Sequence, residues 1–149
     1  IYMKLEGLEG PVIQKGFERY IELTGLNENV GNFIAKTGAG AASSKVQFDD
    51  FKVKKEVDKT SPKLMVNLVS GKHIPQAIIT YKGYNETDVF TITLTDVSIK
   101  NIITTTECKP GCIISEELTL IFEKIKWEFR DAKSGIIQGG YDLKLGKTF

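Results

Sequence analysis

The chain has 149 residues, of which 41% are hydrophobic and 26% charged, and its 20 basic and 19 acidic residues leave a formal net charge of +1. This length and composition predict one globular domain over residues 1–149, and no internal repeat of about 20–50 residues is present. The balanced charge gives no overall field that favours nucleic acid or anionic lipid, so neither class of partner is expected.

Neither a membrane-spanning segment nor a secretory signal is evident in the sequence. No apolar run approaches the ~18 residues of a membrane span, so membrane insertion is not expected. The first residues, IYMKLEGLEG, lack the basic segment followed by an apolar segment of a secretory signal. Because Ile1 is not an initiator methionine, the sequence leaves open that residues precede it or that a signal has been removed.

Two short strands are predicted at residues 1–6 and 17–23, divided by the turn signal Gly10-Pro11. Residues 27–45, NENVGNFIAKTGAGAASSK, follow and keep no sustained period. Their richness in Gly, Ala, Ser and Asn predicts a long loop. Loops of this length inside a domain are often binding loops or contacts to another subunit, and the alternative is a surface excursion without function.

Residues 46–57 predict a strand with a bulge. Apolar residues alternate along it but slip by one position at Asp49-Asp50, and a bulge produces this slip. The apolar residues on the two sides of the slip are Val46 and Phe48, then Phe51, Val53 and Val57. The basic residues of this region and the next are expected to lie on a solvated strand edge and helix start. They are Lys52, Lys54, Lys55, Lys59 and Lys63.

A short helix is predicted over residues 61–70. Thr60 and Ser61 offer a hydroxyl cap, Pro62 suits the first helical position, and Gly71 suits the end. We expect one face of this helix to pack on the sheet, formed by Leu64, Met65, Leu68 and Val69. His73 follows the helix and is expected to be solvent-exposed or to cap the helix end, where a cation would meet the negative end of the helix dipole.

The remaining strands are predicted at residues 77–82, 90–99, 118–129 and 136–143. Two of them repeat the slip in apolar phase, one after Thr95-Asp96 and one at Glu123-Lys124. Strands that bend repeatedly favour a barrel or a tight sandwich over a flat open sheet. The predicted fold class is therefore mainly β, a β-barrel or two-sheet domain with one short helix on its flank.

Cys108 and Cys112 bracket Lys109-Pro110-Gly111, a turn that could bring the two sulfurs within bridging distance. The alternative is a pair of free thiols, as expected in a reducing cytosol. Together with His73 the two cysteines fall short of the four ligands of a closed zinc site unless a carboxylate joins them, and no metal or cofactor is predicted.

Catalytic groupings are not evident. His73 is the only histidine, and no Gly-x-Ser-x-Gly nucleophile elbow occurs. In each of the adjacent pairs Asp49-Asp50 and Glu116-Glu117 the two carboxylates would point to opposite faces of a strand, so neither pair can act jointly on one scissile bond. We expect these four residues to lie at a bulge or at a sheet edge. These observations predict that the chain is not an enzyme.

Five segments carry a family resemblance. They are FDDF at 48–51, KEVDKTSPKL at 55–64, GKHI at 71–74, FEKIKW at 122–127 and GYDL at 140–143. In order and spacing they resemble the haemolysin-coregulated protein (Hcp) family, the tube proteins of bacterial type VI secretion. The residues assigned to this structural motif are Phe48, Asp49, Phe51, Asp58, Ser61, Pro62, Leu64, Gly71, His73 and Trp127.

The resemblance implies a structural subunit that forms a homohexameric ring, stacks into a tube and leaves the bacterial cytoplasm without a classical signal peptide. Its implied partners are further copies of itself, the secretion spike and sheath, and effector proteins that it carries or chaperones. We then expect the 27–45 loop to contact neighbouring subunits or rings through Asn32, Phe33, Ile34, Lys36 and Thr37. The alternative is a binding module or effector carrier for a small molecule or peptide that forms no tubes.

Overall fold

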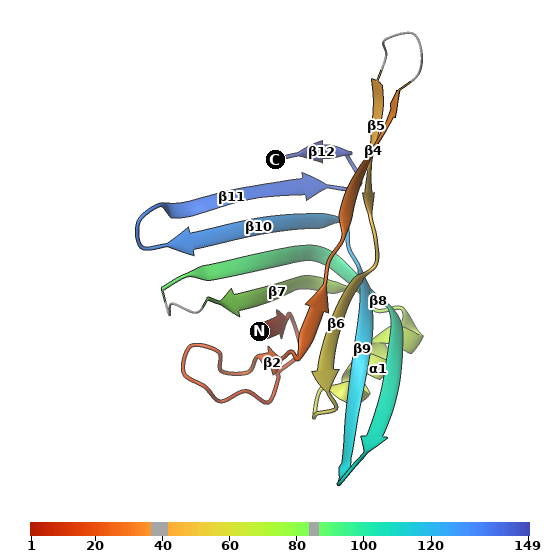
Figure 1. Ribbon diagram of the computed structural model, residues 1–149. Coiled ribbons are helices and arrows are strands. Elements are labelled where there is room, and N and C mark those ends of the chain that lie inside the picture. The colour runs from red at the N-terminus through yellow and green to blue at the C-terminus, as the bar shows by residue number, and fades with distance from the viewer. Residues whose placement is uncertain (37–41, 84–86) are drawn as a thin grey trace.

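The computed structural model describes residues 1–36, 42–83 and 87–149, but not the side chains of residues 33–36 and 42–44. The described residues form strands and one helix, shown in Figure 1. In chain order they are β1 (Tyr2–Leu5), β2 (Ile21–Glu22), β3 (Gly25–Asn27), β4 (Val30–Lys36), β5 (Ala42–Phe48), β6 (Phe51–Glu56), α1 (Ser61–Ser70), β7 (Ile74–Lys82), β8 (Val89–Cys108), β9 (Cys112–Ile121), β10 (Lys124–Asp131), β11 (Gly135–Asp142) and β12 (Lys147–Thr148).

Strand β8 joins two antiparallel sheets. Its first half pairs with β7 and β10 in a sheet of order β12-β11-β10-β8-β7-β1-β2. Its second half, from Ser98 to Cys108, pairs with β9, which continues to β6 and β3. Asp96 lies between the two halves with a left-handed φ of 53°. The 20-residue strand therefore turns from one sheet into the other (Figure 1).

The mainly β fold with one flanking helix is confirmed, in the two-sheet form. In the described residues the strand pairings do not close into a barrel, because β2 and β12 end one path and β3 ends the other. The core lies between the two sheets and under α1. Its fully buried side chains include Met3, Ile21, Phe51, Leu64, Ile79, Ile92, Leu94, Leu118, Leu120 and Ile125.

Two of the three predicted slips are chain breaks and not bends within a strand. β5 ends at Phe48 and β6 begins at Phe51, while β9 ends at Ile121 and β10 begins at Lys124. At each break the chain leaves one sheet and enters another, so the face that points to the core changes and the apolar phase is reset. Only the slip after Thr95 lies within a continuous strand.

The prediction of a loop over residues 27–45 was wrong. β4 and β5 pair from Val30↔Phe48 to Lys36↔Ala42, and the resulting hairpin projects beyond the two sheets (Figure 1). Alternation of apolar and polar residues arises where one face of a strand is buried. A hairpin that leaves the body lacks such a face, so the period-two signal is absent although the backbone is paired.

The predicted strand at 17–23 is shorter than expected, because only Ile21–Glu22 is extended. The preceding residues form turns, in which the Phe17 N–H donates to the Gln14 carbonyl and the Tyr20 N–H to the Phe17 carbonyl. Phe17 is buried nevertheless, so its apolar character reflects packing and not strand structure.

The helix bounds are as predicted, but its contacts differ. Leu64 is fully buried and Leu68 partly so, whereas Met65 and Val69 are 41% and 77% exposed. The helix thus packs along a narrow stripe of residues four positions apart and not along the four-residue face that we expected.

The start of the helix also differs from the prediction. Thr60 makes no hydroxyl cap; its N–H and hydroxyl both donate to the Asp58 carboxylate, at 2.7 and 2.5 Å. Pro62 lies in the first turn, and Gly71, with a φ of 65°, ends the helix as predicted. The Gly71 and Lys72 N–H groups bind the carbonyls of Leu68 and Asn67 at the helix end. His73 is solvent-exposed, which is the first of the two expectations for it. Its Nδ1 lies 2.7 Å from Oδ1 of Asp96.

Candidate functional site

The outer edge of β11 is open over most of its length. β11 pairs with β10 from Gly135 to Asp142, whereas β12 pairs only with Tyr141 and Asp142. Two further bonds join Gly140 to Phe149. In the described part of the chain no strand covers the edge at residues 135–139. An open edge presents unpaired N–H and C=O groups, which are a template for another strand.

Apolar and basic side chains accompany this edge. Ile136 and Ile137 are 55% and 60% exposed, one on each face of the strand. Residues 124–149 carry six basic and three acidic side chains. One of the three, Asp131, accepts the N–H groups of Ser134 and Lys133 in the β10–β11 turn, and these bonds lower the pKa of its carboxyl. We call this surface the β11 end.

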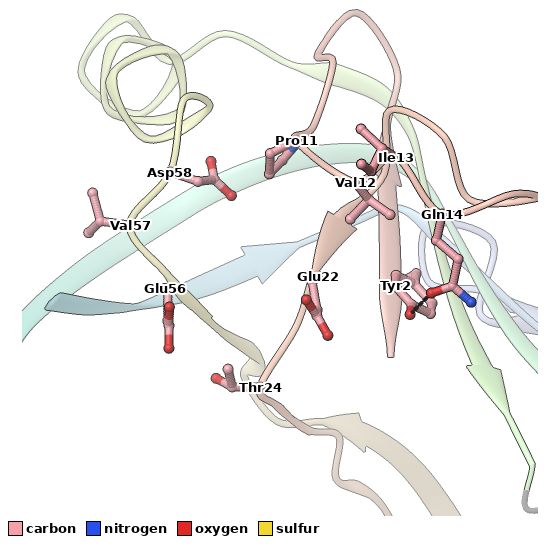
Figure 2. Close-up of a pocket in the computed structure, with 10 residues that line it drawn as sticks. All are labelled: Tyr2, Pro11, Val12, Ile13, Gln14, Glu22, Thr24, Glu56, Val57 and Asp58. Atoms are coloured by element: carbon pink, nitrogen blue, oxygen red, sulfur yellow. Dashed lines mark hydrogen bonds between the residues drawn. The ribbon is translucent and has the colours of Figure 1, made fainter. Parts of the chain in front are cut away.

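The opposite end of the same sheet is acidic. Beside β2 lies an open hollow of about 580 Å³, shown in Figure 2. Three carboxylates line it, those of Glu22, Glu56 and Asp58, and Ile13 on its rim is 92% exposed. Tyr2 closes one side by donating a 2.6 Å hydrogen bond to Gln14 (Figure 2). Residues 1–28 carry five acidic and three basic side chains. We call this surface the β2 end.

The hairpin β4–β5 is the third exposed feature. Of the contact residues predicted from the sequence, the Asn32 side chain is exposed, and Phe33, Ile34 and Lys36 lie in β4. Thr37 lies outside the described residues. The register pairs Asn32 with Val46 and Phe33 with Lys45, so the structure places these four residues on one strand of the hairpin.

The motif residues support the hairpin base and the helix start. The Asn29 side chain donates to the Asp49 carboxylate at 2.6 Å, and the Asp49 N–H donates to the Asn29 carbonyl at 3.0 Å, which closes the hairpin base. The Asp50 carboxylate accepts a hydrogen bond from the Lys100 ammonium at 2.9 Å, and this bond is the main reason that the pKa of the carboxyl is lowered. Among the described residues the two aspartates have different hydrogen-bond partners, Asn29 and Gln47 for Asp49 and Lys100 for Asp50.

Aromatic motif residues gather where the two sheets meet. Phe48 packs against Trp127, Phe122 and Tyr141 with ring centroids 6.4, 6.0 and 5.4 Å away, and Phe51 packs against Phe122 at 6.0 Å. The family motif therefore supplies much of the junction between β5, β6 and β10.

A buried ion pair was missed by the sequence analysis. Lys55 is fully buried, and its Nζ donates to Glu116 at 2.5 Å, to the Ser61 hydroxyl at 3.2 Å and to the Glu56 carbonyl at 2.8 Å. Asp58 adds a carboxylate oxygen at 3.3 Å. The network joins β6, β9 and the start of α1, and it explains the two motif residues Asp58 and Ser61.

Lys55 was placed wrongly on a solvated edge, and Glu116 wrongly at a sheet edge. A signal was present in both cases. Lys55 is in phase with buried Phe51 and Val53, and Glu116 with buried Leu118 and Leu120. The alternation of buried and exposed residues along each strand therefore predicts that the Lys55 and Glu116 side chains are buried, where their opposite charges neutralise each other. Glu117, one position on, lies across the strands from Lys52 and Lys54, 3.8 and 3.6 Å away.

At the far tip of β8 and β9, Cys108 and Cys112 form a disulfide. Both residues are exposed, and they face each other in the strand register. Over the described residues no group of three or more His, Cys, Asp or Glu side chains is placed to hold a metal ion. The helix found in those residues is too short and too polar to cross a membrane.

Comparisons with known protein families, sequences and structures all point to the same family. Residues 2–129 match the family model described as type VI secretion system effector, Hcp. The Pseudomonas aeruginosa protein hcp1 is 30% identical over 105 residues, which span 68% of this chain and 64% of that protein. The chain therefore aligns with slightly less than two thirds of this curated relative.

Solved structures resemble the whole chain. Hcp1 from Salmonella typhimurium has a TM-score of 0.80 at 26% identity, with 99% of this chain and 97% of that one covered. A type VI secretion system effector from Yersinia pestis has a TM-score of 0.77 at 25% identity, with 95% and 98% covered.

Proposed function

The chain belongs to the Hcp family of the type VI secretion system, as its motifs predicted, and from this premise we propose that it is a structural subunit of the secretion tube. The observation that carries the proposal is the family match over residues 2–129. The subunit would form a homohexameric ring, the rings would stack, and the tube would leave the cell with effector proteins inside or attached. The sheath and the spike of the secretion machine would be its further partners.

The two ends of the sheet support a head-to-tail ring. The β11 end is apolar, basic and open, whereas the β2 end is a hollow with three carboxylates. Surfaces that differ in this way, one basic and one acidic, suit a contact between one subunit and the next better than a contact of either surface with a copy of itself. A heterologous contact of this type closes into a ring when its rotation permits.

The binding-module alternative is less well supported. A ligand inside the domain would need space between the two sheets, and packed side chains such as Phe51, Leu118 and Leu120 fill that region. The hollow at the β2 end is open to solvent and lies on the rim of the sheet. We therefore assign it to subunit contact.

Native mass spectrometry tests the proposal directly. A ring of six 16.6 kDa subunits has a mass of about 100 kDa and should predominate at tens of micromolar and moderate salt. Electron microscopy of the concentrated protein should then show stacked rings. A strictly monomeric species would contradict the proposal, and a monomer that binds a small molecule or peptide would favour the alternative.

A further inference from the structure

The chain enters and leaves the β4–β5 hairpin at two residues, Glu28 and Phe48, and both contact the side chain of Trp127 on β10. Glu28 precedes β4, and its Oε1 accepts a 2.8 Å hydrogen bond from the indole Nε1–H. Phe48 ends β5, and its ring lies nearly parallel to the indole, with an interplanar angle of 12° and centroids 6.4 Å apart. One tryptophan thus holds the strand that enters the hairpin and the strand that leaves it.

The surroundings strengthen the hydrogen bond. Glu28 and Trp127 are both half-buried. Burial raises the pKa of the Glu28 carboxyl, and the indole N–H acts in the opposite direction by stabilising the charged form. In such partly apolar surroundings a hydrogen bond is electrostatically stronger than in water. The indole N–H is therefore well placed to hold a carboxylate that has lost part of its hydration.

Other contacts at the hairpin base join the residues just before β4 to those at the end of β5. Asn29 binds Asp49 through its side chain and its carbonyl, and Gln47 donates to Asp49 at 3.1 Å. Among the described residues β4 and β5 pair only with one another. These bonds fix the width of the base. The base is held to the body by the Glu28–Trp127 hydrogen bond and by Phe48, which packs against Trp127 and also against Tyr141 and Phe122, with ring centroids 5.4 and 6.0 Å away. Of these body residues, Trp127 is the one with a described contact to both strands of the hairpin base.

We propose that Trp127 is a positioning residue that sets the direction in which the β4–β5 hairpin leaves the body. The inference rests on the proposed function, in which this hairpin reaches neighbouring subunits. Seven residues of extended chain span roughly 23 Å, so a rotation of about 10° at the base moves the far end by roughly 4 Å. Hydrogen bonds tolerate only a few tenths of an ångström, so six copies in a ring must share one angle to make the same contact.

Three substitutions separate this role from simple packing. Trp127→Phe keeps an aromatic ring beside Phe48 and removes the N–H donor. Glu28→Leu removes the acceptor, whereas Glu28→Gln keeps an oxygen that can accept the same bond. Phe129→Leu, two residues along β10 on a partly exposed side chain, is the matched control.

Hairpin direction is measured by the distance between two spin labels, one at Lys45 on β5 and one at Lys133 in the β10–β11 turn. Both positions are exposed. Cys108 and Cys112 are replaced by Ser, and labelled subunits are diluted in unlabelled ones so that few rings carry two. The distance distribution should be narrow for the parent protein, Glu28→Gln and Phe129→Leu. It should shift or broaden by several ångströms for Trp127→Phe and Glu28→Leu.

Two further measurements complete the test. The double variant Glu28→Leu/Trp127→Phe should alter the distance no more than either single change, because both remove the same bond. Emission of the single tryptophan should change in Glu28→Leu and stay near the parent value in Glu28→Gln. Unchanged, narrow distances in both Trp127→Phe and Glu28→Leu would overturn the positioning role, with thermal melting showing that the variants are folded.

Assembly is the functional readout. Both disrupting variants should keep the ring mass and form at least tenfold fewer stacked tubes, and Glu28→Gln should retain them. An altered distance with undiminished tubes would overturn the link between direction and stacking. If the parent protein itself forms no ring, the proposed function fails, while the label distances still decide the role of Trp127 in the isolated subunit.

Discussion

At the scale of single residues, the pair Lys55 and Glu116 is the most informative feature. Their side chains are 0% and 2% exposed, and a buried charge is tolerated only when it is paired and hydrogen-bonded. Ser61 binds both partners, since its hydroxyl donates to Glu116 at 2.7 Å and accepts from Lys55. The network therefore fixes where α1 starts relative to the β6–β9 ladder.

We predict that Lys55→Met destabilises the fold by about 3–5 kcal/mol, because Glu116 would remain buried without its cation. Urea unfolding at neutral pH measures the effect. The double variant Lys55→Met/Glu116→Leu should recover most of the loss. Lys54→Met is the matched control, since Lys54 is exposed and its 3.6 Å pair with Glu117 is worth about 1 kcal/mol or less. Equal effects at positions 54 and 55 would contradict the buried network.

Asp142 provides a prediction about pH. The Leu145 N–H donates to its carboxylate at 2.8 Å, and Lys124 lies 3.2 Å away; both contacts lower its pKa, the backbone bond most strongly. The folded-state pKa is below the unfolded value, so the unfolded chain binds more protons in acid. The resulting stability is present above the ordinary pKa of 3.8 and is lost as the pH falls through the folded-state value.

Asp142→Asn should therefore be less stable than the parent protein at neutral pH, and the difference should shrink as the pH is lowered below 4. Thermal melting across a pH series measures it. Asp88→Asn, at a residue outside the strands, serves as the control for the loss of one carboxylate. A constant difference between parent and Asp142→Asn at all pH values would mean that the charge of Asp142 contributes nothing.

At the scale of elements, α1 shows which sequence signals are sufficient. Its start and end follow from Pro62 and Gly71, whose backbone preferences act locally. The buried face of the helix could not be predicted from the same local signals. Four apolar residues lie on one side of the helix, and the sheet covers only part of that side. Which of them is buried depends on the position of β8, and that position is a property of the tertiary fold.

Leu64→Ala should cost about 2–5 kcal/mol of unfolding free energy, because the side chain is fully buried in the core. Val69→Ala is the matched control on the same helix; its side chain is 77% exposed, so a change within about 0.5 kcal/mol is expected. Comparable losses at the two positions would show that α1 packs on the body through a different face.

The strands show the same division between local and tertiary signals. The slips in apolar phase at Asp49-Asp50 and Glu123-Lys124 marked real places in the chain, but they marked a change of sheet and not a bulge. Periodicity records which face is buried and not which strand is the neighbour. For the same reason the hairpin β4–β5, which projects from the body, gave no periodic signal.

At the scale of the whole molecule, the family and the fold class were predictable, and the assembly surfaces were not. The family motif consists of short segments that can be read directly from the sequence, most of them between Phe48 and Ile74. The β11 end and the β2 end instead depend on which strands are left at the rims of a sheet, and only the pairing order β12-β11-β10-β8-β7-β1-β2 shows this. The overall net charge of +1 also conceals that acidic and basic residues are separated between the two ends.

This separation leads to a prediction about how subunits join. Ile137→Asp places a negative charge on the open edge of β11, and Ile13→Lys places a positive charge on the rim of the acidic hollow. Each variant loses one of the two surfaces, so each alone should be monomeric with unchanged melting. The control is Ile103→Asp, at a position that is 50% exposed on the β8–β9 hairpin and lies at neither end. It should still form rings.

Mixing the two variants distinguishes a head-to-tail contact from a symmetric one. The Ile13→Lys subunit keeps an intact β11 end, and the Ile137→Asp subunit keeps an intact β2 end, so mixing should restore association, beginning with a 1:1 dimer of about 33 kDa. The two substituted ends carry opposite charges, so the dimer can also extend. The dimer should weaken as salt is raised, because charges of opposite sign meet in it. A symmetric interface uses the same patch on both subunits and would not be restored by mixing. A mixture that remains monomeric at tens of micromolar would therefore remove these two ends as the ring contact.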